Sequence, residues 1–273
     1  MFPNKIEASV LTLSWIAAQY LVVYYLSYSG ASWEAGNPII YITVTVFSTM
    51  LIAIYSSRKM QLNLSMLFHA NRNDSTTLIV LSLPPIIMFV LGFQVLLSDY
   101  FNVYTLIFPN ATEMSKNIGS LMYNGFLGFV CVGVIAPFAE EIIFRGVILR
   151  GLLSSYGSTQ AILFSSILFS LMHLNPDQLF HTLLIGIFFG WLYVRSFSLW
   201  PSIFAHMSFN TVVYMLNATD IKIQGINYFP NNVLVFPSLT LQLVSIGLIV
   251  SSVYLLKKVL WYTHSPNNPS QQD

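Results

Sequence analysis

The chain has 273 residues, of which 55% are hydrophobic and only 8% are charged. Soluble domains carry about 25% charged residues, so this composition excludes an ordinary soluble protein and indicates a membrane protein. The net charge of +1 gives no reason to expect nucleic acid as a partner. A helix satisfies its own backbone hydrogen bonds in lipid, and we therefore predict an all-α, polytopic membrane helical bundle.

Eight apolar segments reach or approach the roughly 20 residues that a helix needs to cross a bilayer. The adjacent prolines Pro84 and Pro85 should kink the third segment, because proline lacks a backbone donor. The sequence therefore predicts about eight transmembrane helices. In chain order, they cover approximately residues 8–28, 38–55, 77–97, 121–150, 159–173, 178–195, 199–216 and 233–256.

The basic residues predict the orientation of these segments. Placing the N-terminus in the cytosol puts nine of the eleven Lys and Arg residues on the cytosolic side, as the positive-inside rule requires. An even number of spans then returns the C-terminus to the cytosol as well. The cytosolic residues are Lys5, Arg58, Lys59, Arg72, Arg145, Arg150, Arg195, Lys257 and Lys258, and the other two are Lys116 and Lys222.

The candidate chemistry is concentrated in one part of the chain, residues 121–217. Residues 1–120 hold membrane helices without motifs. Residues 218–273 hold the last transmembrane helix and a polar tail, which we expect to be disordered and cytosolic.

Two adjacent carboxylates, Glu140 and Glu141, lie inside an apolar segment. A charge within the membrane costs at least a few kcal/mol, so such residues are candidates for a functional site. Neighbouring helical residues point about 100° apart, which gives the two acids different roles. Arg145 lies four residues after Glu141 and should pair with it, leaving Glu140 to face a cavity. Pro137 should loosen the helix just before this site. Alternatively, both acids lie at the cytosolic end and reach water.

Three further polar residues end or interrupt apolar segments. His173 follows Phe169 by four residues and therefore lies on the same helical face, although a histidine at a span end is also typical of the membrane interface. His206 and Asn210 are likewise four residues apart. Asn210 could alternatively bind a neighbouring helix, as amides do in membrane bundles. His181 has no partner by spacing, and we expect it to pack.

One carboxylate, two imidazoles and an amide could together hydrolyse a peptide bond. Glu140 would act as the general base, His173 would help to hold the water, and His206 with Asn210 would donate to the oxyanion. Alternatively, Glu140, His173 and His206 could bind a divalent metal such as zinc. The HExxH pattern of common metalloproteases is absent. The expected cofactor is therefore none or one metal ion.

Three motifs resemble those of the CPBP family, which includes CAAX proteases and bacteriocin-processing enzymes. They are EExxxR at Glu140 to Arg145, FxxxH at Phe169 to His173, and HxxxN at His206 to Asn210, in the family's order. The resemblance implies a CAAX prenyl protease-like intramembrane endopeptidase, of glutamate or metallo type, in a prokaryotic cell membrane.

The resemblance also implies a role for each motif residue. Glu140, His173, His206 and Asn210 would be catalytic, and Glu141, Arg145 and Phe169 would support them. The substrate would be a peptide or membrane protein within the lipid bilayer. The alternatives are a non-catalytic immunity or scaffold protein that binds a partner in the bilayer, and a proton-coupled transporter.

Overall fold

The computed structural model describes residues 2–28, 37–68, 75–108, 125–228 and 234–262. Every regular element in these ranges is a helix. An isolated β-bridge joins Gln224 and Tyr228. The predicted all-α fold is thus confirmed. The elements are α1 (Lys5–Tyr28), α2 (Pro38–Lys59), α3 (Leu64–Phe68), α4 (Ser75–Ile107), α6 (Gly125–Phe129), η2 (Val130–Ile135), α7 (Ala136–Glu141), η3 (Ile142–Leu149), α8 (Arg150–Leu153), α9 (Ser158–Leu171), α10 (Pro176–Ser196), α11 (Leu199–Ala218) and α12 (Leu239–Tyr262).

Each of the eight predicted segments contains a helix. The starts of the fourth and eighth segments, residues 121–124 and 233, lie outside the described residues. Helix α9 is apolar but short. Within the described part of the chain, five helices or helical runs are long and apolar enough to cross a membrane, so the protein is a helical membrane bundle. They are Pro38–Lys59, Ile79–Ile107, Gly125–Leu153, Pro176–Ser196 and Leu239–Leu260.

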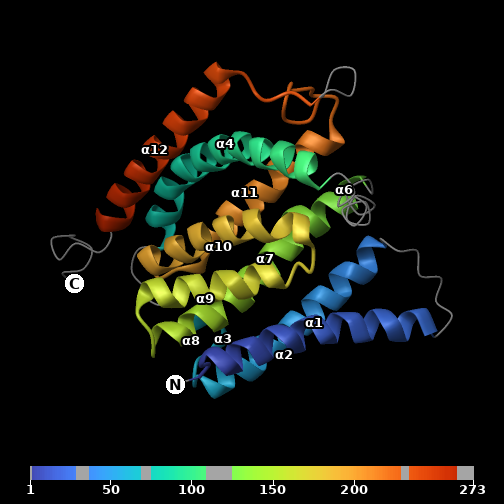
Figure 1. The fold of residues 1–273 in the computed structure, drawn as a ribbon. Helices are drawn as coiled ribbons and strands as arrows, with labels where there is room; N and C mark the ends of the chain where they lie inside the picture. Colours follow the sequence, from blue (N-terminus) through green and yellow to red (C-terminus); the bar gives the residue numbers. More distant parts are fainter. Residues whose placement is uncertain (1, 29–36, 69–74, 109–124, 229–233, 263–273) are drawn as a thin grey trace.

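The helices form three groups in space (Figure 1). Helices α1 and α2 lie at one side of the bundle, and α4 and α12 lie at the other. Between them run α7, α9, α10 and α11, and the polar motif residues lie on these helices or directly after them. The helices that carry the candidate site are therefore the middle group of the bundle.

Helix α4 packs along α12 at close range. Pro84 and Pro85 lie inside α4, and the helix is curved in Figure 1, as the two prolines predict. The Ser252 hydroxyl of α12 donates to the Pro85 carbonyl at 2.6 Å. Gly92 permits the approach, because a Cβ atom at this position would lie 2.6 Å from the Ser245 carbonyl oxygen.

We expect Gly92→Ala to destabilise the protein by about 1–3 kcal/mol, because the added methyl group forces the two backbones apart. Thermal unfolding in detergent would measure the loss. Gly247→Ala is a matched control on α12, since a Cβ atom there meets nothing within 4 Å. Equal melting temperatures for the two variants would contradict the close α4–α12 contact.

Residues 125–153 form one helical run in which α-helical bonding is interrupted by two π-helical stretches. The α-helical turns around Glu140 are flanked by two π-helical stretches, η2 and η3. Pro137 lies in the first turn of α7, directly after η2. π-Helical turns are rare and occur often at functional sites, and η2 coincides with the loosening that Pro137 predicts.

Candidate active site

The two adjacent glutamates bracket a single imidazole. Glu140 is 8% exposed and Glu141 is fully buried, both on α7. The Glu141 Oε1 atom lies 2.9 Å from Nδ1 of His206, and the Glu140 Oε2 atom lies 3.8 Å from Nε2 of the same ring. Adjacent helical residues point about 100° apart, yet both acids reach the same imidazole. The angle places them at opposite edges of the His206 ring.

Arg145 is the second partner of Glu141. Its Nη1 atom donates to Glu141 Oε1 at 2.8 Å, which confirms the predicted pair. Its Nη2 atom donates to the Gly186 carbonyl of α10 at 2.9 Å. The guanidinium also lies over the rings of Phe169 and Phe189, 4.6 and 5.4 Å from their centroids. Arg145 thus connects α10 to the acidic pair.

The protonation of His206 follows from its neighbours. The Glu141 oxygen that faces Nδ1 already accepts from Arg145, so the shared carboxylate is an acceptor and Nδ1 carries the hydrogen. The Nε2 atom is then the nitrogen that faces Glu140. The Phe189 ring stacks on the imidazole at 4.8 Å and fixes its plane. Glu141 therefore orients His206 as a carboxylate orients a catalytic histidine.

His173 is joined to the site through Phe169. The His173 Nδ1 atom lies 2.9 Å from the Phe169 carbonyl oxygen, which can only accept, so Nε2 is the nitrogen that remains for other partners. The Phe169 ring makes edge contacts with both imidazoles, 5.0 Å from that of His173 and 5.6 Å from that of His206. The predicted shared face of Phe169 and His173 is confirmed, and Phe169 is the common neighbour of the polar groups.

Asn210 binds the helix that carries the acids. Its Nδ2 atom donates to the Val132 carbonyl of η2 at 2.8 Å. One of its two N–H groups is therefore used within the protein. Asn210 thus binds a neighbouring helix, which was the alternative to an oxyanion donor, and Val132 is a partner that the motif does not indicate.

The Glu140 Oε2 atom is a buried acceptor with no hydrogen-bond partner among the described residues. Buried polar atoms are nearly always bonded, so an unbonded one in a polar site needs an explanation, and a catalytic role is one such explanation. This atom lies across from His206 Nε2 at the centre of the site. The site therefore sets a carboxylate oxygen without a hydrogen bond beside an imidazole nitrogen.

The predicted metal ligands do not come together as a set of three. Within the ranges that the structure describes, no three His, Cys, Asp or Glu residues are arranged to hold one metal ion. Glu140 and His206 are close to each other, but His173 does not complete a set with them. As they are placed in the described structure, Glu140, His173 and His206 thus do not form a three-ligand site.

Two residues outside the three motifs also contact the motif residues or the helical run that carries the acids. Phe189 stacks on His206, and Tyr214 of α11 donates from its hydroxyl to the Gly125 carbonyl at 2.6 Å. The signal for Tyr214 was its spacing of four residues from Asn210. His181, expected to pack, is buried with its ring 5.1 Å from that of Phe101.

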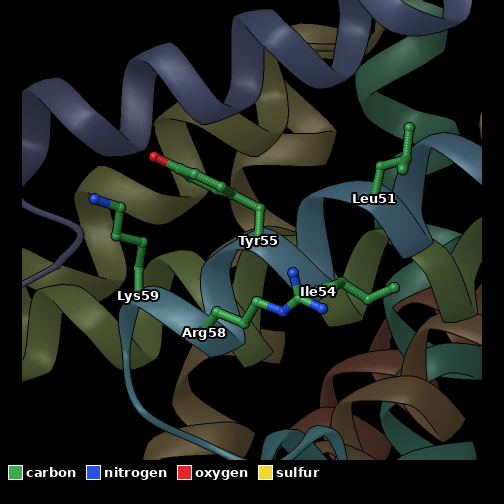
Figure 2. Close-up of a pocket in the computed structure, with 5 residues that line it drawn as sticks. All are labelled: Leu51, Ile54, Tyr55, Arg58 and Lys59. Carbon is green, nitrogen blue, oxygen red and sulfur yellow. The ribbon is translucent and has the colours of Figure 1, made fainter.

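A surface hollow of about 390 Å³ lies at the end of α2 (Figure 2). Among the described residues, those that line it all belong to α2. It includes none of the motif residues and is therefore not the candidate active site. The lining residues are Leu51, Ile54, Tyr55, Arg58 and Lys59.

The fold and the site define a helical membrane protein with buried acid and imidazole groups. Residues 123–212 match the family described as type II CAAX prenyl endopeptidase Rce1-like. Over 96 residues the chain is 31% identical to a Bacillus subtilis (strain 168) protein named "Putative membrane peptidase YdiL". That alignment covers 35% of this chain and 39% of the relative. No solved structure matches. The resemblance to the CPBP proteases is thus confirmed for the segment that carries the three motifs.

Proposed function

We propose that this protein is an intramembrane endopeptidase that hydrolyses peptide bonds of a membrane-associated peptide or protein. The observation that carries the proposal is the unbonded Glu140 Oε2 atom, buried and 3.8 Å from Nε2 of His206. The matches to an Rce1-like peptidase family and to a protein named as a membrane peptidase support it.

In the proposed reaction, Glu140 acts as the general base. Its carboxylate takes a proton from water while the water oxygen bonds to the carbonyl carbon of the substrate. The C–N bond then breaks, and the amine leaves with the proton that Glu140 had taken. Nε2 of His173, which remains available because Nδ1 is bonded, would hold the water.

The oxyanion needs a donor while the tetrahedral intermediate exists. His206 supplies this donor when Nε2 carries a proton, and Glu141 keeps that nitrogen aimed at the site by binding Nδ1. Arg145 balances the charge of Glu141, and the rings of Phe169 and Phe189 exclude water from this pair. In the proposed reaction, these contacts thus orient the oxyanion donor and keep its supporting ion pair out of water.

The direct test is peptide cleavage by the purified protein in liposomes. A quenched fluorescent peptide with an apolar membrane segment should be cut, and water labelled with heavy oxygen should add one labelled atom to the new carboxylate. A wild-type protein that binds such peptides without cutting any of them would favour a scaffold and contradict the proposal.

We expect His206→Leu to reduce kcat by about 10²-fold or more, because an oxyanion donor is lost in a site that excludes water. Steady-state cleavage in the same liposomes measures the effect. Met207→Leu is the matched control, since this neighbouring change conserves volume. Full activity of His206→Leu would show that this imidazole does not touch the reaction.

A further inference from the structure

Three side chains of α11, spaced four residues apart, bind the helical run that holds the acids. His206 donates to Glu141, Asn210 donates to the Val132 carbonyl at 2.8 Å, and Tyr214 donates to the Gly125 carbonyl at 2.6 Å. Their partners follow one another in reverse order along residues 125–141. We call these three residues the α11 ladder. Its middle member, Asn210, binds a backbone group within the π-helix η2.

The Val132 carbonyl needs a partner because of its position before Pro137. In a helix, a carbonyl accepts from the N–H four residues later, or five residues later in a π-helix. The N–H of Ala136, four residues later, donates to Cys131 instead. Residue 137 is a proline and has no N–H. Neither usual donor is available to Val132, and Asn210 replaces them.

The π-helical turn sets the direction of Glu140. Each residue turns a helix by about 100°, so a turn with one extra residue rotates everything after it by that amount. If η2 relaxed to α-helix, the carboxylates of Glu140 and Glu141 would leave the two edges of His206. A bond that keeps η2 in place therefore also keeps the acids in place.

We infer that Asn210 is a positioning residue, which aims Glu140 by binding the carbonyl that Pro137 leaves without a donor. This inference rests on the proposed role of Glu140 as the base. It assigns Asn210 a task different from the oxyanion donor expected from the sequence. The inference makes a specific prediction: a backbone N–H restored at position 137 can replace the Asn210 amide as the donor to the Val132 carbonyl.

The test is a cycle of four proteins: wild type, Asn210→Leu, Pro137→Ala and the double variant. Asn210→Leu should lower kcat by about 10- to 100-fold with little change in KM, and should lower the melting temperature. In the double variant, the backbone N–H restored at position 137 can donate to Val132 and continue the bonding of Ala136 to Cys131. Both kcat and the melting temperature should then return most of the way. Asn217→Leu is the control, since Asn217 is exposed and its side chain bonds within α11, to the Val213 carbonyl.

Two outcomes would overturn the inference. Asn210→Leu could retain full kcat, or the double variant could regain stability while remaining as slow as Asn210→Leu, which would place Asn210 on the substrate. Nitrogen NMR of the His206 ring gives a readout that needs no activity: the signature of the Nδ1 bond to Glu141 should be lost in Asn210→Leu and recovered in the double variant. If wild type cuts no peptide, this spectrum still decides the positioning role, and only the proposed function fails.

Discussion

Glu140→Gln should reduce kcat by about 10²- to 10⁴-fold while KM stays near the wild-type value. Glutamine keeps the shape of the side chain but cannot take a proton from water, and general bases contribute this range of rate. An interaction used only in the transition state is lost from kcat and not from substrate binding. Single-turnover cleavage in liposomes, with excess enzyme, measures the chemical step itself.

The control for this experiment is Asp220→Asn, the same chemical change at an exposed acid outside the site. It should cleave at the wild-type rate. Unchanged turnover by Glu140→Gln, in a protein whose melting temperature equals that of wild type, would eliminate Glu140 as the base. Glu141 could not replace it without giving up its bonds to Arg145 and His206.

Glu141→Ala should produce the largest loss of stability, about 3–5 kcal/mol, because it leaves the guanidinium of Arg145 buried without its acid. It also removes the acceptor for His206 Nδ1. Thermal unfolding in detergent and the yield of folded protein would both report the change. Glu140→Ala is the matched control on the same helix, because the buried Oε2 atom that it removes has no hydrogen bond within the described part of the chain.

A compensating variant separates the ion pair from general damage to the helix. Glu141→Leu combined with Arg145→Met removes both charges and restores apolar packing, so it should recover much of the stability lost in Glu141→Ala. Its activity should remain low, since His206 still has no carboxylate to orient it. Equal melting temperatures for Glu140→Ala and Glu141→Ala would contradict the assigned pairing.

Much of this architecture was predictable from local patterns. Apolar segment length predicted the helices, and four-residue spacing predicted the bond between Glu141 and Arg145 and the contact of Phe169 with His173. These predictions succeed because both partners belong to one helix or its end, where spacing fixes distance. The curvature of α4 was predictable for the same reason, since its cause lies within the helix.

Contacts between helices were not predictable in this way. Glu141 meets His206 across 65 residues of chain, and Asn210 meets Val132 across 78. Spacing indicates that two side chains share a face, but not which helix that face meets. The π-helical turns also rotate the residues that follow them. A prediction that assumes a regular α-helix omits this rotation. For this reason spacing could not decide whether His173 joins Glu140 and His206 around a metal, and the described residues do not form such a set.

The two hydrogen bonds of Glu141, one with Arg145 and one with His206, have a consequence for the protonation of the site. With Arg145 neutralising Glu141, the remaining charge is decided by Glu140 and His206 together. The four side chains Glu140, Glu141, Arg145 and His206 have no net charge when Glu140 and His206 together carry one proton in addition to the one on Nδ1 of His206. Either member can carry it, so the two groups behave as a single acid. The pH dependence of the rate then reflects Glu140 and His206 as a pair, and it cannot be assigned to either residue alone.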